Sequence, residues 1–134
     1  MPALTLPAPR TPDPMTAPSL RWGIVGTGWI AERFVTSLRD FTTQGRYAVA
    51  SSRPSSARDF AARMGMERAH AGVDDLLADP RVDVVYVATP HHTHEELALR
   101  AIAAGKPVLI EKPLGINGVQ ARRIADRARE AGVF

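Results

Sequence analysis

The sequence predicts an α/β fold in which helices cover both faces of a doubly wound parallel sheet. From Arg21 to the C-terminus, apolar segments of strand length alternate with segments of helical periodicity. Such alternation is typical of parallel sheets with right-handed crossover connections. The chain has 134 residues, of which 45% are hydrophobic, so it is long enough to bury one core of this kind. A single folded domain is therefore expected.

The first twenty residues differ in composition from the rest of the chain. They hold six of the eleven prolines and show no periodic apolar pattern. Proline lacks a backbone donor and has a fixed φ, so this composition disfavours a helix or an inner strand. We therefore expect residues 1–20 to form a disordered or extended arm and residues 21–134 to form the folded domain. Met15 offers an alternative start of translation close to the domain.

The first half of the domain is predicted to hold three strands and three helices. Ile30, Phe34 and Leu38 recur at helical spacing after the first strand. Pro54 suits the first position of the second helix, and Gly65 suits its end. The expected strands are 22–25, 47–51 and 68–71, and the expected helices are 29–40, 54–64 and 74–78.

The second half of the domain is predicted to hold two more strands and two more helices. Residues 82–88 are apolar apart from Asp83, as a central strand covered on both faces must be. Thr93 and Glu96 have the spacing of a capping box, which predicts that a helix begins there. The expected remaining elements are that helix as far as Gly105, a strand at 108–110, and a last helix capped by Asn117 and ending at Gly132.

A glycine-rich turn joins the first strand to the first helix. It reads Gly26-Thr27-Gly28-Trp29-Ile30-Ala31, which has the G-x-G-x-x-A spacing. Gly26 permits a tight turn, Gly28 lets the backbone approach a pyrophosphate, and Ala31 lets the helix pack closely on the strand. Backbone N–H groups and the positive end of the helix dipole then face the anion. Because the motif lies between a strand and a helix, it favours a Rossmann dinucleotide-binding domain over a simple connecting turn.

The end of the second strand predicts which dinucleotide is bound. An Asp or Glu about 20 residues beyond the fingerprint usually binds the adenosine ribose hydroxyls, whereas an Arg accommodates a 2′-phosphate. Here Ser52 and Arg53 take that place, and no acid follows before Asp59. A hydroxyl donates to phosphate oxygens and a guanidinium pairs with them in a fork. We expect NADP as cofactor and NAD as second choice, with Arg58 as a weaker phosphate ligand; the alternative is that Arg53 is only an exposed loop residue.

Three histidines follow the fourth expected strand. His91, His92 and His94 suggest a metal site, because imidazole is a common transition-metal ligand. No other histidine, cysteine or spaced carboxylate completes a convincing ligand set, so no metal is predicted. Instead, Thr89-Pro90-His91 leaves the strand at its carboxyl end, where the turn and the imidazole can flank the nicotinamide and its ribose. His94 is either a site residue or a surface or packing histidine.

Lys112 is the best single candidate for chemistry. It lies between Glu111 and Pro113 at the end of the last expected strand. Its ammonium can stabilise developing alkoxide character on a substrate hydroxyl as hydride leaves the adjacent carbon. Pro113 restricts the preceding backbone and so helps to aim the lysine. The alternative is an ordinary surface lysine in a loop.

Composition and charge exclude several classes of function. The net charge is +3, but basic and acidic residues are interleaved, so no nucleic acid is expected as partner. The arginine-rich segment 122–129 is interpreted as a solvated helix face. No apolar run approaches the roughly 20 residues of a membrane span, and the N-terminus lacks the apolar core of a secretory signal. Without cysteine there is no disulfide or thiolate chemistry, and a soluble, cytoplasmic protein is expected.

The whole pattern resembles a known family. The segments GIVGTGWIA, VDVVYVATPHHTH and AGKPVLIEKPLGIN, with the Ser52-Arg53 pair between them, are similar to the amino-terminal domain of the Gfo/Idh/MocA oxidoreductases. The resemblance covers residues 21–134. Within the family, the chain is most similar to the NADP-dependent dihydrodiol and D-xylose dehydrogenase branch.

The resemblance implies roles for individual residues. Lys112 matches the family lysine near the nicotinamide and substrate. Contacts to the cofactor are implied for Gly26, Thr27, Gly28, Trp29, Ile30, Thr89, Pro90, His91 and Glu111. Members of this family oxidise or reduce small molecules such as sugars and diols, which the resemblance implies as substrates of the full-length form.

The resemblance also implies a second domain that this sequence does not contain. In the family that domain supplies the substrate pocket, a further acid/base residue and the oligomer interface, and the present sequence stops at Phe134. Three interpretations stay open. The chain is a fragment or truncated reading frame of an oxidoreductase that retains NADP binding, a stand-alone nucleotide-binding module, or a remnant without function.

Overall fold

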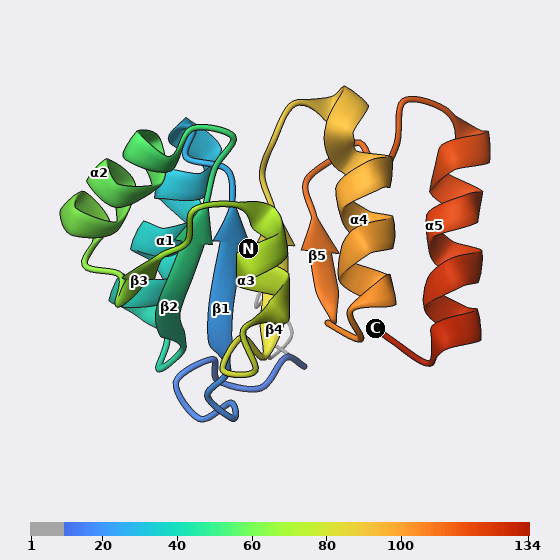
Figure 1. Ribbon diagram of the computed structural model, residues 1–134. Coiled ribbons are helices and arrows are strands. Elements are labelled where there is room, and N and C mark those ends of the chain that lie inside the picture. The colour runs from blue at the N-terminus through green and yellow to red at the C-terminus, as the bar shows by residue number, and fades with distance from the viewer. Residues whose placement is uncertain (1–9) are drawn as a thin grey trace, which may run out of the picture.

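The computed structural model describes residues 10–134 and has a five-stranded sheet at its centre (Figure 1). All strand pairs are parallel, in the order β3-β2-β1-β4-β5. Helices lie on both faces, so the predicted doubly wound α/β fold is confirmed. The elements are β1 (Arg21–Val25), α1 (Trp29–Phe41), β2 (Gly45–Ala50), α2 (Pro54–Met64), β3 (Arg68–Ala69), α3 (Val73–Ala78), β4 (Val84–Val87), a 3-10 turn η1 (His91–Thr93), α4 (His94–Ala103), β5 (Val108–Ile110) and α5 (Gly118–Ala131).

Each face of the sheet is covered by its own pair of helices. α1 and α2 pack on one face against Ile24 and Val49, and α3 and α4 pack on the other against Tyr47 and Val85. α5 lies outside α4 and buries Ile124 against it. The chain connects the strands outward in both directions from the centre, so the strand order reverses between β1 and β4. In doubly wound sheets this switch point opens a crevice at the carboxyl ends of the strands.

Most of the predicted helix ends are confirmed. The side chain of Asn117 accepts a hydrogen bond from the Gln120 N–H at 2.9 Å and so caps α5. Gly65 and Gly132 end α2 and α5, each with a φ of 64°. This left-handed conformation is the one in which glycine replaces other residues at low cost.

The predicted capping box at the start of α4 is wrong. The 3-10 turn η1 precedes the helix and gives Thr93 helical backbone angles, φ −97° and ψ −8°. A capping side chain needs an extended backbone at its own position. The Thr93 hydroxyl donates instead to the Pro90 carbonyl at 2.7 Å, and Glu96 pairs with Arg100 at 3.1 Å.

The end of the predicted N-terminal arm contacts the domain. Residues 1–9 lie outside the described part of the chain, so the arm stays a prediction there. The Ser19 hydroxyl donates to the Thr43 carbonyl at 2.7 Å. The Gln44 side chain accepts from the Leu20 N–H at 3.0 Å and donates to the Pro18 carbonyl at 2.9 Å. Residues 18–20 are thus held against the loop between α1 and β2.

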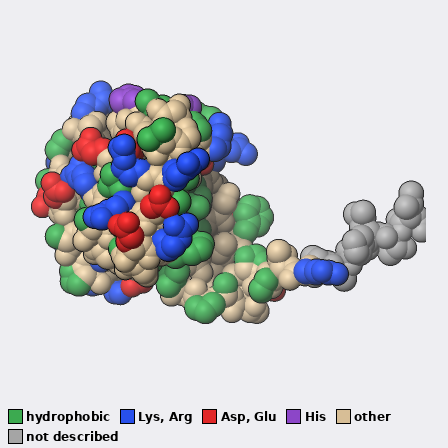
Figure 2. Space-filling model, turned by 90° about the vertical axis from the view of Figure 1, so that its right-hand side faces the viewer, with side chains coloured by type: hydrophobic (Ala, Val, Ile, Leu, Met, Phe, Trp, Pro, Cys, Tyr) green, Lys and Arg blue, Asp and Glu red, His purple; other side chains and the backbone are tan. Residues whose placement is uncertain are grey.

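The surface of α5 mixes charges of both signs, as Figure 2 shows. Arg127 pairs with Glu130 at 2.9 Å and Arg129 pairs with Asp126 at 2.8 Å. Such exposed pairs contribute little stability, but they leave no block of one sign on this helix. Among residues 10–134, no helix is both long and apolar enough to cross a membrane.

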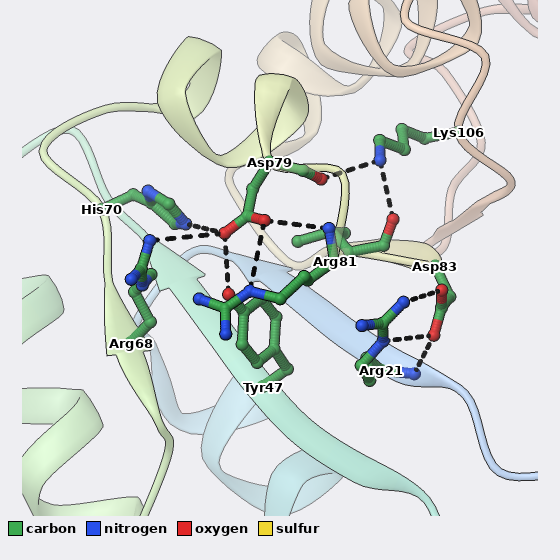
Figure 3. Close-up of polar contacts among 9 residues, drawn as sticks. Arg21, Tyr47, Arg68, His70, Asp79, Arg81, Asp83 and Lys106 are labelled. Carbon is green, nitrogen blue, oxygen red and sulfur yellow. Dashed lines mark hydrogen bonds and ion pairs between the residues drawn. The ribbon is translucent and has the colours of Figure 1, made fainter.

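A buried carboxylate joins the elements at the amino-terminal side of β4 (Figure 3). Asp79 is only 7% exposed and accepts hydrogen bonds from the Tyr47 hydroxyl at 2.8 Å and the Arg81 N–H at 2.9 Å. Its carboxylate also contacts His70 Nε2 at 3.2 Å. The Lys106 ammonium donates to the Asp79 carbonyl at 2.9 Å. β2, the segment after β3, the α3–β4 loop and the α4–β5 loop therefore meet at one residue.

These contacts stabilise the ionised form of Asp79. Burial alone raises the pKa of Asp79, but the hydrogen bonds from Arg81 and Tyr47, with the positive charge of Arg81, outweigh it and leave the pKa below its ordinary value. Nearby, the hydrogen bonds from Arg21 bring the pKa of Asp83 down to about 2. A carboxyl group with a depressed pKa stabilises the fold above its unfolded pKa and loses that contribution as pH falls through the folded pKa.

Asp79→Asn is therefore expected to destabilise the domain at neutral pH by about 1 to 3 kcal/mol, the cost of weakening buried hydrogen bonds to a charged group. Urea unfolding at pH 7 and below pH 3.8, the ordinary Asp value, measures the effect. The difference between the variant and the parent should shrink progressively as the pH falls below 3.8, because the parent loses the stability of its ionised carboxylate as the pH approaches and passes the lowered folded pKa. The exposed Asp75, changed to Asn, is the control. An Asp79→Asn protein as stable as the control at pH 7 would refute the role of this carboxylate.

Candidate functional site

A cleft of about 780 Å³ lies at the carboxyl ends of β1, β2 and β4. Its walls come from four loops and from the first turns of α4, and it occupies the switch point of the sheet. Seven of the residues predicted to bind cofactor line it: Gly26, Thr27, Gly28, Ser52, Arg53, Thr89 and Pro90.

Gly26 sits where a side chain cannot fit. Its φ is +112°, and a Cβ at this position would lie 2.3 Å from the carbonyl oxygen of Ala88. Its N–H donates to the Ala50 carbonyl at 2.9 Å. The residue thus passes between the ends of β2 and β4 because it has no side chain.

Gly28 differs from Gly26 because it faces open space. A Cβ there would meet nothing within 4 Å. Gly28 is the N-cap of α1, and its position carries no side-chain cap. The first amides of a helix need an acceptor from outside. Here they begin at the wall of the cleft, where an anion can accept from them.

Arg53 stands at the wall of the cleft beyond β2. Its backbone N–H lies 3.4 Å from the Ser51 hydroxyl, and its side chain is exposed. Within the described part of the chain, no hydrogen bond or ion pair engages its guanidinium. Among residues 10–134, Glu96 is the one acidic residue that lines the cleft, and it lies on α4, not at the end of β2. A positive side chain thus occupies the place where NAD enzymes commonly carry a carboxylate.

Lys112 and Glu111 follow β5, the neighbour of β4 in the sheet, and neither residue lines the cleft. The Glu111 N–H donates to the Val87 carbonyl at 2.9 Å, which aligns the end of β5 with that of β4. The peptide bond between Lys112 and Pro113 is cis. The Lys112 side chain is exposed. Three further predicted cofactor ligands also lie outside the cleft lining: Trp29, Ile30 and His91. Trp29 is 73% exposed and His91 is exposed, whereas Ile30 faces inward from α1 and packs against the core.

His94 joins the two loops that carry the predicted site. The ring is fully buried, so a surface role is excluded. Nδ1 lies 2.8 Å from the Pro113 carbonyl oxygen, and Nε2 lies 3.0 Å from the Thr89 carbonyl oxygen. Both neighbours are acceptors, whereas a neutral imidazole donates from one nitrogen only. The tautomer decides which of the two carbonyls receives the hydrogen bond.

The histidines do not converge on a common point. The His91 ring packs edge to face on the His94 ring, with centroids 5.6 Å apart. In residues 10–134, no group of three His, Cys, Asp or Glu side chains is placed to hold a metal ion.

Sequence reasoning missed several residues of the site. Gly72, Val73 and Arg100 line the cleft opposite the glycine turn. Arg100 reaches from α4 to Asp74 on α3 at 2.5 Å and so joins these two helices beside the cleft wall. Tyr86 donates a hydrogen bond to Glu111. No local signal identifies the contact of Arg100 with Asp74 or that of Tyr86 with Glu111, because these partners lie 26 and 25 positions apart along the chain.

Comparisons with known proteins agree with this geometry. The model of an oxidoreductase family with an NAD-binding Rossmann fold, GFO_IDH_MocA, matches residues 20–134. Trans-1,2-dihydrobenzene-1,2-diol dehydrogenase of Mus musculus is 40% identical over 118 residues, which make up 87% of this chain and 35% of the relative. The Homo sapiens enzyme of the same name is 36% identical over the same shares of the two chains. The chain thus spans 35% of the length of these curated relatives.

Solved structures show the same fold with bound dinucleotides. GenD2 from gentamicin A biosynthesis, in complex with NAD, matches with a TM-score of 0.82 and 35% identity over 94% of this chain and 35% of its own. A mutant of KijD10, a 3-ketoreductase from Actinomadura kijaniata in complex with TDP-benzene and NADP, has a TM-score of 0.80 and 38% identity over 87% of this chain and 37% of its own. Levoglucosan dehydrogenase in complex with NADH and levoglucosan has a TM-score of 0.78 and 27% identity, over 87% and 33%. The structural neighbours bind both kinds of dinucleotide.

The two glycines of the turn should respond differently to substitution by alanine. Gly26→Ala places a Cβ against the Ala88 carbonyl in a left-handed conformation, so we expect destabilisation by at least about 1 to 3 kcal/mol. Gly28→Ala fills open space, and its stability should stay within about 0.5 kcal/mol of the parent. Chemical unfolding monitored by circular dichroism measures both. Equal stabilities of the two variants would show that the close approach at Gly26 does not constrain the fold.

Proposed function

Because the chain belongs to the Gfo/Idh/MocA family of oxidoreductases, which has an NAD-binding Rossmann fold, we propose that its cleft binds a nicotinamide dinucleotide and prefers NADP(H) to NAD(H). The observation that carries this proposal is the exposed guanidinium of Arg53 at the cleft wall, in the place of the usual carboxylate. NAD(H) is the second choice.

The residues of the cleft suit the pyrophosphate of such a cofactor. Gly28 leaves an open approach to the backbone, since even a Cβ there would touch nothing within 4 Å. The first amides of α1 have no side-chain cap and start at the same wall. Two phosphate groups bring the acceptors that these amides lack. Thr89 and Pro90, on the opposite wall, would lie along the nicotinamide half of the molecule.

The other end of the cleft suits a 2′-phosphate. Ser52 and Arg53 lie on the wall beyond β2, where the adenosine ribose of a Rossmann cofactor is bound. A hydroxyl donates one hydrogen bond to a phosphate, and a guanidinium donates two in parallel. No carboxylate at the end of β2 repels the phosphate.

We further propose that Lys112 acts on the substrate in the full-length form. When bound, the nicotinamide supplies the chemistry of hydride transfer. Lys112 lies at the end of β5, two strands from β1, and would hold its ammonium at the substrate hydroxyl and stabilise the charge that develops on that oxygen. The names of the similar enzymes support a sugar or diol as substrate. The substrate pocket, the acid/base partner and the oligomer interface would come from a further domain.

Nucleotide binding without catalysis is the alternative function. The glycine turn, Ser52, Arg53 and Thr89 all lie within this chain, so the described residues carry a dinucleotide cleft by themselves. Positioning a substrate carbon against the nicotinamide requires a pocket as well. Turnover by the 134-residue chain alone with xylose or a diol would exclude this alternative.

Calorimetry tests the cofactor preference. Arg53→Ala should lose about 1 to 3 kcal/mol of NADP(H) binding free energy and little of NAD(H) binding, because it removes a charge-assisted contact to the 2′-phosphate. Arg122→Ala, an exposed arginine on α5 that is not part of the cleft lining, is the matched control. Gly28→Val should abolish binding of both cofactors in a folded protein. Equal losses of binding free energy for NADP(H) and NAD(H) in Arg53→Ala would refute the assignment of Arg53 to the 2′-phosphate.

Steady-state kinetics of a fusion protein tests Lys112. Residues 21–134 would be joined to the second domain of a related dehydrogenase. Lys112→Ala should then lower turnover at least about a hundredfold, the scale of a lost acid/base or charge-stabilising group, while NADP(H) affinity changes much less. Lys112→Arg keeps the charge but cannot give up its proton, so it separates electrostatic stabilisation from proton transfer. A fully active Lys112→Ala fusion would remove this lysine from the mechanism.

A further inference from the structure

We infer that Tyr86 is a positioning residue for the loop that carries Lys112. Its hydroxyl holds the carboxylate of Glu111, and that carboxylate holds the backbone amide of Lys112. The inference rests on the proposed function of Lys112 beside the nicotinamide. Tyr86 itself lies in the core and touches neither the cleft nor a reacting atom.

The relay consists of two hydrogen bonds through one carboxylate. The Tyr86 hydroxyl donates to Glu111 Oε1 at 2.5 Å. The Lys112 N–H donates to Glu111 Oε2 at 3.1 Å. Each carboxylate oxygen therefore has its own donor, and the plane of the carboxylate is fixed between β4 and the first residue of the loop. Hydrogen bonds to a charged acceptor are the stronger ones in proteins.

The first member of the relay is rigid. Tyr86 is 2% exposed and lies in the middle of β4. Its ring stacks on Phe34 of α1 with centroids 4.0 Å apart, and Phe34 packs edge to face on Trp22. Burial raises the pKa of Tyr86 well above its ordinary value, and the hydrogen bond to Glu111 raises it further, so the hydroxyl stays a donor.

The second member of the relay depends on the first. Glu111 is half-buried at the open end of β5, and its side chain has these two donors among the described residues. Without the tyrosine hydroxyl, a carboxylate at this place gains more from water than from a single amide. Glu111 would then turn outward, and the Lys112 amide would lose its acceptor. The first residues of the loop that carries Lys112 would then be less well ordered.

A second buried tyrosine provides a control for this inference. Tyr47 also donates to a carboxylate, that of Asp79, at 2.8 Å. It lies on the opposite face of the sheet, among the residues packed against α3 and α4. Asp79 keeps the Arg81 N–H as a donor when the tyrosine hydroxyl is removed. The pair Tyr86→Phe and Tyr47→Phe therefore deletes the same group from two similar sites, of which one adjoins Lys112.

The experiment measures amide hydrogen exchange and ligand binding on the 134-residue chain. In Tyr86→Phe, exchange of the Lys112 amide should accelerate at least about fivefold, because its hydrogen bond is lost, while the Glu111 amide, bonded in the sheet ladder, keeps its rate. NADPH affinity should fall about three- to tenfold, as for one weakened polar contact. Affinity for 2′,5′-ADP, which lacks the nicotinamide half, should not change. Tyr47→Phe should move none of these values.

The outcomes separate this inference from the proposed function. If the exchange rate of the Lys112 amide is unchanged in Tyr86→Phe, the relay does not exist. If that exchange accelerates but NADPH affinity is unchanged, Tyr86 is not a positioning residue. If the parent chain binds neither NADPH nor 2′,5′-ADP, the proposed function fails, and amide exchange still decides whether the relay exists. Glu111→Ala removes the acceptor itself and should free the Lys112 amide in the same way, which provides the measurement if Tyr86→Phe does not fold.

Discussion

The close approach of the chain at Gly26 is the constraint on which the site depends. The Gly26 N–H is bonded to the Ala50 carbonyl at the end of β2, and a Cβ on this residue would collide with the Ala88 carbonyl at the end of β4. The Ala88 N–H in turn donates to the Val25 carbonyl at 2.9 Å. Three strand ends therefore meet at a residue that has no room for a Cβ. This junction sets the direction in which α1 begins and leaves the cleft beside it.

Two buried tyrosines each donate a hydrogen bond to a carboxylate, and the two bonds stabilise different parts of the molecule. On the face under α3 and α4, Tyr47 and the buried Asp79 join β2 to the loops at the amino-terminal side of β4. On the other face, Tyr86 bonds to Glu111 beside the exposed Lys112. The first carboxylate is surrounded by donors and serves the stability of the fold. The carboxylate of Glu111 accepts from Tyr86 and from the Lys112 N–H, and it lies next to Lys112, the proposed catalytic residue.

His94 joins the loops that follow β4 and β5. Its two ring nitrogens contact the Thr89 and Pro113 carbonyl oxygens, one in each loop. The ring is sealed from water, so breaking either contact leaves a polar group buried without a partner. The proposed nicotinamide contact at Thr89 and the proposed catalytic Lys112, next to Pro113, thus lie in loops that share one buried side chain at the start of α4.

The sequence by itself determined the fold class, most element boundaries and the edge of the sheet where the site lies. Alternating periodicities identify strands and helices locally, and glycine at positions such as Gly26 and Gly132 marks turns that other side chains disfavour. Parallel strands place their carboxyl ends at one edge, so Gly28, Arg53 and Lys112 could be assigned to that edge because each follows a predicted strand closely. None of this requires knowledge of distant contacts.

Only the tertiary structure decided which side chains meet. Thr93 has the spacing of a cap, yet the turn before α4 directs its hydroxyl to Pro90. His94 is equally compatible with the surface or the core in the sequence, and its burial follows from the packing of two loops around it. Tyr86 looks like one more apolar strand residue, although its hydroxyl meets a carboxylate 25 positions away. Partners so far apart are chosen by strand order and register, which depend on the packing of the whole sheet and leave no trace in any local pattern.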